Sequence, residues 1–166
     1  GGDSFAEPLL ERDAWPLEVA IAVTATLEKE VGSSSGMERS ADSSPYYSAW
    51  VATQDADLKA ARAAIRARDF AALAEVAERN CLKMHAAALA ATPPLLYWNG
   101  ATVECVHAIR RLRSGGEPVF FTIDAGPQVK AICLPEARSR VATELRAVPG
   151  VLDVLSSRLG PGAELR

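Results

Sequence analysis

Asp124 is the acidic residue of this sequence whose neighbours best suit chemistry. It ends the apolar run PVFFTID, residues 118–124, and the small residues Ala125 and Gly126 follow it. A carboxylate fixed at the end of a strand, with room for a ligand beside it, can act as a general base. An aspartate in this position can equally cap the turn by accepting hydrogen bonds from backbone amides, and the residues alone favour this second role.

The segment VGSSSGM, residues 31–37, is a second candidate site. It offers three hydroxyl groups in a row, backbone amides around Gly32 and Gly36, and a nearby cation at Arg39. Hydroxyl and amide donors can hold phosphate oxygens, and an arginine adds positive charge. Segments rich in serine and glycine are more often simple connections, and the sequence has no GxxxxGK[ST] pattern of a P-loop.

The histidines and cysteines form no recognisable catalytic or metal-binding pattern. His85 shares a helix side with Leu82 and Leu89, which indicates a half-buried, hydrogen-bonded side chain, whereas His107 falls on a polar face. The three cysteines are far apart in apolar contexts, so we expect buried, reduced thiols of the kind found in cytoplasmic proteins. Neither metal-ligand spacing nor a GxSxG nucleophile elbow occurs, which disfavours metal hydrolases and serine hydrolases.

Composition predicts a globular protein of one domain. The 166 residues are 49% hydrophobic and 23% charged, with a net charge of -3 and scattered basic residues, so a nucleic-acid partner is not expected. The longest apolar stretch, residues 86–98, is too short to span a membrane. Because the chain opens with Gly1 rather than methionine, we expect a fragment in which residues 1–16 are a lead-in from a missing N-terminal domain and residues 17–166 form the domain.

The candidate residues lie between helices and strands that the sequence also predicts. A buried strand rich in Val is expected over 17–25, followed by an irregular loop over 29–44. Ser44 and Pro45 suit a helix start, so a helix of about 20 residues is expected next. Its predicted apolar side consists of Tyr47, Trp50, Val51, Leu58, Ala61 and Ile65.

Two more helices and a hairpin follow in the pattern. Asp69 is expected to cap a helix that Pro93 ends, and Asn99 a helix that Gly115 ends. The runs 118–124 and 128–134 read as two strands of a hairpin, after which a helix from Pro135 and a strand over 151–157 are expected. This order predicts an α+β fold, a ferredoxin-like split βαβ sandwich with a four-stranded antiparallel sheet, helices on one face and extra helices in the first crossover.

Three segments stand out by their order and separation: VGSSSGMERSADSSPYY (31–47), ERNCLKMHAAALAATPPLLYWN (78–99) and VFFTIDAGPQVKAICL (119–134). Together they resemble the C-terminal half of mevalonate diphosphate decarboxylases, which belong to the GHMP kinase superfamily. The resemblance covers nearly the whole chain. It implies a two-domain enzyme whose second domain has the ferredoxin-like fold predicted above.

The resemblance also implies roles for individual residues. Asp124 would face the tertiary 3-hydroxyl of mevalonate 5-diphosphate, as a base or as an orienter of that hydroxyl, and would stabilise positive character at C3. Ser33 would lie beside the substrate diphosphate, whereas Gly32 replaces a serine that is usual in the family. The further substrate-binding candidates are Ser34, Gly36, Arg39 and Gly126.

The activity implied is phosphorylation of that hydroxyl by ATP with Mg²⁺, then loss of phosphate and carbon dioxide to give isopentenyl diphosphate. ATP and Mg²⁺ would be bound mainly by the protein's own N-terminal kinase-like domain. The chain alone is therefore not expected to catalyse the reaction, and no metal site is expected in it. A cytoplasmic homodimer is expected. A phosphomevalonate decarboxylase, a mevalonate 3-kinase relative, and a non-catalytic small-molecule-binding module on the same fold are the alternatives.

Overall fold

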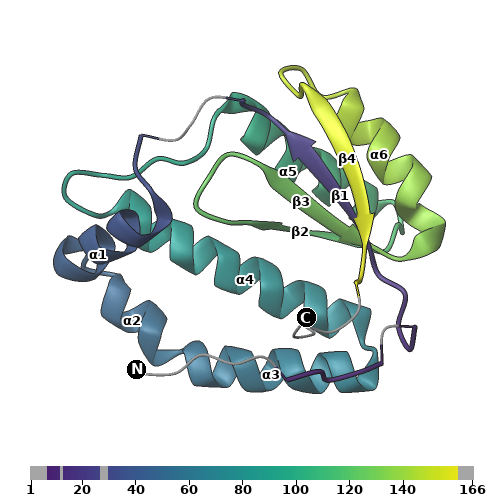
Figure 1. Ribbon diagram of the computed structural model, residues 1–166, viewed down its shortest axis with the longest axis horizontal. Coiled ribbons are helices and arrows are strands. Elements are labelled where there is room, and N and C mark those ends of the chain that lie inside the picture. Colours follow the sequence, from purple (N-terminus) through teal and green to yellow (C-terminus); the bar gives the residue numbers. More distant parts are fainter. Residues whose placement is uncertain (1–6, 12, 27–29, 161–166) are drawn as a thin grey trace, which may run out of the picture.

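A four-stranded antiparallel sheet organises the chain. The computed structural model describes residues 7–11, 13–26 and 30–160. Its strands are β1 (Glu18–Val23), β2 (Val119–Ile123), β3 (Val129–Cys133) and β4 (Asp153–Arg158), in the order β2-β3-β1-β4 (Figure 1). The two strands of each βαβ half are separated by a strand of the other half, which is the split arrangement that the sequence predicts. The predicted α+β, ferredoxin-like class is therefore confirmed.

Alternation along the strands places the core on one face of the sheet. Ala20 of β1 pairs with Ala131 of β3 and Ser156 of β4, and both alanines are almost fully buried. The buried strand side chains pack against α5 (Gly100–Ser114) and α6 (Arg138–Arg146), which follows a short 3₁₀ turn at Pro135–Ala137. Residues two apart in a strand share a face, so the alternate strand positions point to the other side.

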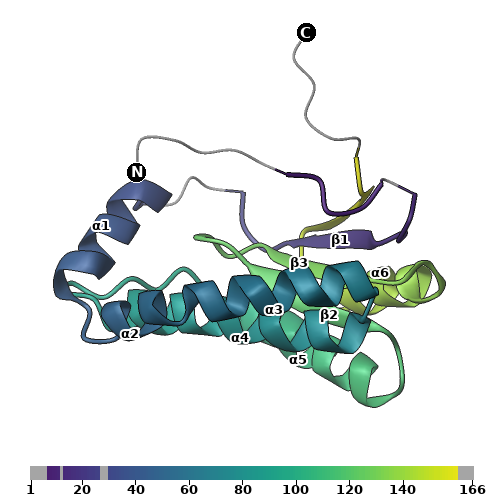
Figure 2. The ribbon, with the colours of Figure 1, turned by 90° about the horizontal axis from the view of Figure 1, so that it is seen from below.

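The remaining helices form a second group beside the sheet. They are α1 (Ser33–Ser43), α2 (Tyr47–Ala52), α3 (Gln54–Ala67) and α4 (Phe70–Leu89). Helix α3 packs on α4, which in turn lies along β2 (Figure 2). All four belong to the first crossover, between β1 and β2, together with α5. An expanded crossover was predicted, but with three helices, whereas the described residues form five between β1 and β2.

Helix α4 covers the outer edge of β2 with its own side chains. The Phe121 amide donates to Glu78 Oε1 at 3.1 Å, and the Ile123 amide donates to Cys81 Sγ at 3.3 Å. His85 Nε2 lies 3.0 Å from the Ile123 carbonyl oxygen. An uncovered edge strand leaves such groups free to pair with other chains. These contacts satisfy the edge and fix the end of β2, where Asp124 follows.

The loop predicted over 29–44 is wrong, because its larger part is helix α1. Gly32 is the extended N-cap residue, and the Gly36 amide donates to the Gly32 carbonyl at 2.9 Å. The amide of Gly36 is thus used within the helix, contrary to the expectation that it is exposed. Gly36 and Ser40 form the buried side of the helix. Small residues let the helix approach its neighbours closely, and they leave no apolar period in the sequence.

The single helix of about 20 residues predicted after Ser44 is also wrong. Helix α2 begins at Tyr47, and the helix is interrupted at Thr53 before α3 begins at Gln54. Thr53 Oγ1 donates to the Trp50 carbonyl at 2.8 Å, and Gln54 Nε2 donates to the same oxygen at 3.1 Å. Side chains therefore satisfy the backbone where α2 ends. The break turns α3, so that Leu58, predicted to face inward, is exposed.

The other elements match their predictions closely. Asn99 caps α5 through a capping box with Thr102, as predicted, and the buried side of the helix is Thr102, Cys105, Val106, Ala108, Ile109 and Leu112. The cysteines are free and buried, and burial raises the pKa of both Cys105 and Cys133 to about 11. No helix in the described residues has the length and apolar character needed to cross a membrane.

Candidate functional site

Asp124 lies just beyond the end of β2 with its carboxylate toward solvent. Its side chain is 78% exposed, and Lys130 Nζ of β3 donates to Asp124 Oδ2 at 2.5 Å. The Gly126 amide donates to the main-chain oxygen of Asp124 at 2.7 Å, which closes the turn without the carboxylate. The carboxylate therefore contacts the lysine of β3, and the Gly126 amide contacts the main-chain oxygen of Asp124 instead of its side chain.

Lys130 was missed in the sequence. It lies six residues after Asp124, and no motif marks it. The signal was present in the hairpin itself, because the register pairs Thr122 with Lys130 across β2 and β3. Residues of neighbouring strands that pair in this way lie on the same face of the sheet. A register assigned to the two predicted strands would have placed the lysine beside Asp124.

The loop after Asp124 is anchored at its far end. The carbonyl oxygen of Pro127 accepts hydrogen bonds from Thr24 Oγ1 at 2.9 Å and from Thr102 Oγ1 at 2.8 Å. Gln128 accepts from the Thr24 amide at 2.7 Å and donates to the Ala25 carbonyl at 2.7 Å. Thr102 is fully buried. The loop is thus tied to the end of β1 and the start of α5, which holds Asp124 in place.

The N-terminal turn of α1 lies close to this loop. Ser33, Gly36 and Ala125 line the same small internal cavity, of about 10 Å³. Its other lining residues are Met37, Ser40, Trp50, Met84, Ala88 and Tyr97. The structure therefore brings the predicted residues Ser33 and Gly36 to the residue that follows Asp124, although the two segments are about ninety positions apart in the sequence.

The remaining predicted residues are distributed around α1 and the loop. Ser34 lines a shallow hollow of about 470 Å³ with Ser33 and Glu38, whereas Arg39 lines a cavity of about 400 Å³ with Pro127. Ser34 and Arg39 thus border different hollows. A Cβ atom on Gly126 would meet nothing within 4 Å, so open space lies beside the loop, as close approach of a ligand requires.

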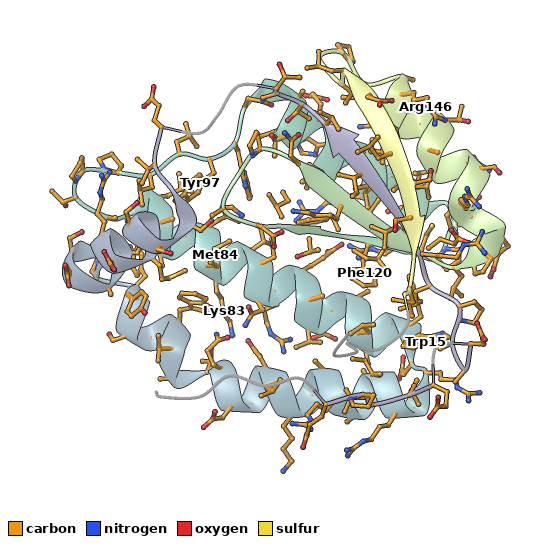
Figure 3. The ribbon with its side chains drawn as sticks, viewed as in Figure 1. Trp15, Lys83, Met84, Tyr97, Phe120 and Arg146 are labelled. Carbon is orange, nitrogen blue, oxygen red and sulfur yellow. The ribbon has the colours of Figure 1, made fainter. Side chains whose placement is uncertain are left out.

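A hollow of about 530 Å³ runs from Asp124 over the sheet face that α5 and α6 leave open. Its walls come from β1, β2, β3, α2 and α4. Figure 3 shows Met84 at the part of α4 nearer α1, with Phe120 farther along. Trp50 also lines this hollow, and its Nε1 is the one buried side-chain donor without a hydrogen-bond partner in the described part of the chain. Asp124 is the acidic residue of the lining.

His85 lies behind the site and is structural, as its sequence context indicated. It is 3% exposed, and burial lowers the pKa of its imidazole, so the ring is neutral at pH 7. Trp98 Nε1 approaches His85 Nε2 at 3.3 Å, and the Ile123 carbonyl approaches the same nitrogen at 3.0 Å. Because one neutral nitrogen either donates or accepts, the two contacts belong to different tautomers.

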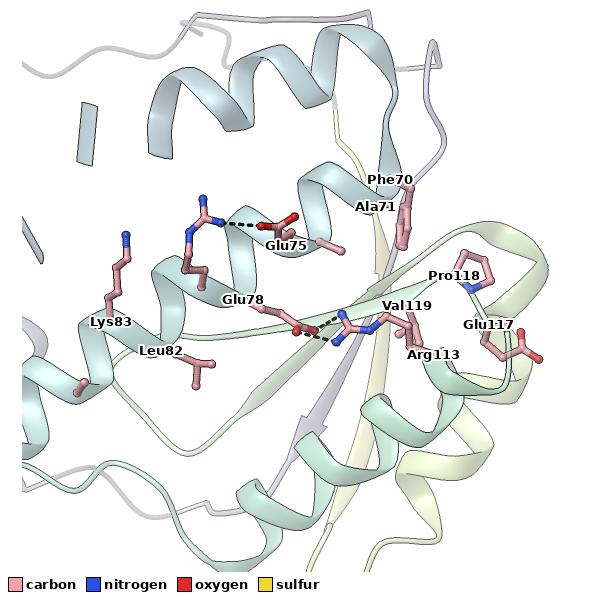
Figure 4. A pocket seen from close by; sticks show the side chains of 14 residues that line it. Phe70, Ala71, Glu75, Glu78, Leu82, Lys83, Arg113, Glu117, Pro118 and Val119 are labelled. Carbon is pink, nitrogen blue, oxygen red and sulfur yellow. Dashed lines mark hydrogen bonds and ion pairs between the residues drawn. The ribbon is translucent and has the colours of Figure 1, made fainter. Parts of the chain in front are cut away.

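A larger cavity, of about 880 Å³, lies away from Asp124 between α4, α5 and the start of β2 (Figure 4). Its lining is mainly apolar and contains none of the predicted site residues. Arg113 spans it with two hydrogen bonds to Glu78, at 2.8 and 2.9 Å. These two side chains satisfy each other and the edge of β2. The Arg113–Glu78 pair is therefore used by the fold.

The described residues do not form a metal site. No group of three or more His, Cys, Asp and Glu side chains among them could hold a metal ion. The acidic residue of the candidate site is Asp124, which forms an ion pair with Lys130.

Comparison with known proteins gives a consistent result. Residues 19–155 match the model of the mevalonate 5-diphosphate decarboxylase C-terminal domain. The diphosphomevalonate decarboxylase of Aspergillus fumigatus is 32% identical over 155 residues, which is 90% of this chain and 38% of that protein. The human enzyme of the same name is 31% identical over 141 residues, 82% of this chain and 35% of that protein.

Solved structures show the same similarity. The mevalonate diphosphate decarboxylase of Staphylococcus aureus superposes with a TM-score of 0.81 at 32% identity, covering 87% of this chain and 44% of that one. A protein designated MDDEF, solved in complex with MVAPP, AMPPCP and magnesium, superposes with a TM-score of 0.80 at 32% identity, covering 88% and 45%. The chain thus spans less than half the length of these relatives.

Proposed function

The chain belongs to the mevalonate 5-diphosphate decarboxylase family, whose C-terminal domain it matches, and from that premise we propose that it works within an ATP-dependent decarboxylase. The reaction proposed converts mevalonate 5-diphosphate to isopentenyl diphosphate, carbon dioxide, ADP and phosphate. This reaction would belong to the mevalonate pathway of isoprenoid biosynthesis. The position of Asp124 carries the proposal.

Asp124 is the catalytic residue in this proposal. Its carboxylate is exposed at the rim of a hollow, and the loop behind it is anchored by Thr24 and Thr102. With Oδ2 held by Lys130, Oδ1 is available to accept the hydrogen bond or the proton of the substrate's 3-hydroxyl. The negative charge would also stabilise positive character that develops at C3. Both roles require a carboxylate in a fixed position.

Helix α1 provides the proposed contact with the substrate diphosphate. Ser33 and Ser34 form its first turn, and Gly32, the N-cap residue, makes no side-chain capping bond. Backbone amides at a helix N-terminus, with the helix dipole, favour anions. Ser33 also lines the cavity that contacts Ala125, next to the catalytic residue. A glycine at 32 removes one hydroxyl that the family pattern would supply.

Arg39, Gly36 and Gly126 would support this substrate site in different ways. Arg39 borders the cavity beside Pro127 and would attract an anionic group from that side. Gly126 would leave room for the substrate. Gly36 would act indirectly, because its packing sets the place of α1.

ATP and Mg²⁺ are proposed to bind mainly outside these residues, in an N-terminal kinase-like domain joined through residues 1–16. The proposal rests on the protein designated MDDEF, which was solved with AMPPCP and magnesium together with MVAPP and of which this chain covers 45%. When bound, the nucleotide and its metal would supply the phosphoryl group. A homodimer and a cytoplasmic location complete the proposal, and light scattering and cell fractionation test them.

The direct test measures carbon dioxide release by the intact protein with ATP. Mevalonate 5-diphosphate, mevalonate 5-phosphate and mevalonate are compared as substrates, with ADP formation recorded in parallel. Release from the diphosphate alone is expected. Release from the monophosphate would identify a phosphomevalonate decarboxylase, and ADP without carbon dioxide would identify a 3-kinase. If none of the three compounds gives a product, the proposal is wrong, and a non-catalytic binding module is the alternative that remains.

A further inference from the structure

Asp124 and Lys130 form an ion pair that joins the loop to the open face of the sheet. Lys130 Nζ lies 2.5 Å from Asp124 Oδ2. The lysine side chain is 26% exposed and the aspartate side chain 78% exposed, so the lysine is the more enclosed of the two. Lys130 belongs to β3, in the middle of the hairpin register with Thr122. The strand therefore fixes the lysine, and the lysine in turn restrains the carboxylate.

Other described cations have different partners or positions. Lys83 and Arg79 of α4 bond to Asp57, and Arg113, at the opposite end of β2, bonds to Glu78. Arg39 borders a separate cavity beside Pro127. The charges of Asp124 and Lys130 both act on His85, but burial lowers the pKa of its ring and keeps it neutral. Among the described residues, Lys130 is the cation whose ion pair reaches Asp124.

We propose that Lys130 is a positioning residue for Asp124, which holds Oδ2 so that Oδ1 faces the 3-hydroxyl of the substrate. This inference rests on the proposed function. A mispositioned catalytic group loses much of its effect even when the shift is small, because reaction requires a narrow range of distances and directions. An exposed carboxylate without a partner rotates freely about its side-chain bonds, whereas the ion pair selects one orientation.

Lys130 has a second effect that follows from the chemistry of the substrate. Mevalonate 5-diphosphate carries its carboxylate two carbon atoms from the hydroxyl-bearing carbon. Placing that hydroxyl on Asp124 brings two carboxylates close together, and like charges at such distances repel. The ammonium group of Lys130 offsets this repulsion. The residue therefore favours a 3-hydroxy acid as the ligand of Asp124, rather than a neutral alcohol.

The ion pair is exposed on one side, and such pairs contribute little to the stability of a fold. Removing the charge of Lys130 should therefore change activity far more than stability. This separates a positioning role from a merely structural one. The test uses the intact protein with Lys130→Met, which keeps the long stem, and Lys130→Arg, which keeps the charge. Lys59→Met, on an exposed position of α3, is the matched control.

The expected result for Lys130→Met is a loss in kcat of about 10- to 100-fold in carbon dioxide release. The KM for ATP should stay within about 2-fold of the wild type, since the nucleotide does not contact this ion pair in the proposal. Lys130→Arg should recover most of the lost rate, because it restores the cation. Lys59→Met should match the wild type. If Lys130→Met fails to fold, Lys130→Gln replaces it, with the same expectations.

A double-mutant cycle decides whether Lys130 acts through Asp124. The affinity for mevalonate 5-diphosphate is measured by calorimetry in the wild type, Lys130→Met, Asp124→Asn and the double variant. Lys130→Met should weaken binding in the wild type and have less than about a 2-fold effect in Asp124→Asn. Equal losses in both backgrounds would mean that Lys130 contacts the substrate by itself, which overturns the inference.

The outcomes also separate this inference from the proposed function. An active wild type whose Lys130→Met variant behaves like Lys59→Met contradicts the role of Lys130 and leaves the decarboxylase intact. A wild type that releases no carbon dioxide but binds mevalonate 5-diphosphate contradicts the proposed reaction, and the calorimetric cycle then still tests Lys130. A wild type that neither releases carbon dioxide nor binds the compound overturns both.

Discussion

Asp57 and Asp124 are two aspartates in opposite surroundings. Asp57 is 7% exposed on α3 and takes hydrogen bonds from Lys83 at 2.8 Å, Asn80 at 3.1 Å and Arg79 at 3.2 Å. Both of its oxygens are therefore occupied. Asp124 is exposed, and among the described residues its carboxylate accepts a hydrogen bond from Lys130 on one oxygen, Oδ2. A carboxylate has about four acceptor sites. Asp124 therefore keeps acceptor sites for a ligand, whereas Asp57 uses its own for contacts within the fold.

Asp57 should make the stability of the chain depend on acid. The hydrogen bond from Lys83, above all, lowers its pKa from 3.8 to about 2. A carboxyl whose pKa is lower in the folded state stabilises the fold while it is ionised, above about pH 4, and this stabilisation is lost as the pH falls toward 2. At about 1.4 kcal/mol for each pKa unit, the effect is on the order of 2 kcal/mol.

The measurement compares urea unfolding of the wild type and Asp57→Asn from pH 7 to pH 2. The variant should be less stable by on the order of 2 kcal/mol at pH 7, and the difference should shrink as the pH drops below about 4. Asp55→Asn, an exposed first-turn residue of the same helix, is the control and should change stability by less than about 0.5 kcal/mol. A difference that stays constant down to pH 2 would show that the ion pairs do not cause it.

At the scale of elements, α1 connects the fold to the site. Its buried side is made of Gly36 and Ser40, and Ser40 Oγ donates to the Gly36 carbonyl at 2.8 Å. A Cβ atom built on Gly36 would overlap the hydroxyl of Tyr97, while Tyr97 Cζ and Leu95 Cδ1 would lie at 3.4 and 3.5 Å. Glycine is therefore required at position 36 because any Cβ atom there would overlap the hydroxyl oxygen of Tyr97.

Gly36→Ala should destabilise the chain, and Tyr97→Phe should reverse the loss. Overpacking costs about 1–3 kcal/mol, from which the better helix propensity of alanine subtracts up to about 1 kcal/mol. Without the Tyr97 hydroxyl, the nearest atoms stand at ordinary contact distances, so the double variant should be at least as stable as Tyr97→Phe. The unfolding free energies of the four proteins test this coupling.

Gly100→Ala is the matched control for this experiment. Gly100 begins α5, and a Cβ atom there would meet nothing within 4 Å. This substitution should be neutral or stabilise by up to about 1 kcal/mol. If Tyr97→Phe fails to rescue Gly36→Ala, then the close contact described between α1 and Tyr97 is not what requires the glycine.

The elements differ in how far the sequence alone could predict them. Helix α5 was predicted well because Asn99 caps it and its buried residues recur with the helical period, and the hairpin because its strands alternate around a short turn. Helix α1 was missed because small polar residues carry no such period. The break at Thr53 was missed because no glycine or proline marks it. The side chains of Thr53 and Gln54 satisfy the backbone there instead.

The site was predictable in part, for a related reason. Asp124 and Ser33 lie in segments that resemble a family, so the sequence could mark both of them. Lys130 became visible only when the register of β2 and β3 placed it opposite Thr122. Pro127 is anchored by Thr24, 103 positions before it, and by Thr102, 25 positions before it. Such contacts depend on tertiary structure and leave no local pattern.

At the scale of the whole molecule, the chain is proposed to supply one side of an active site. It spans 38% of its Aspergillus fumigatus relative and 44% of the Staphylococcus aureus structure, so the complete activity is a property that only the intact protein can show. The open hollow beside Asp124, and the first turn of α1, face the side where the substrate is proposed to bind. In the proposal, the fold supplies there a carboxylate held by Lys130 and a helix N-terminus that would bind the diphosphate.

The most direct test of this account is carbon dioxide release from mevalonate 5-diphosphate by the intact protein and its Asp124→Asn variant. The variant keeps the size of the side chain and removes its charge. We expect a loss of at least about 1,000-fold in rate, with unchanged nucleotide affinity and with Asp55→Asn as an active control. A variant that retains a near-normal rate would contradict the account, because Asp124 would then be no more than part of a turn.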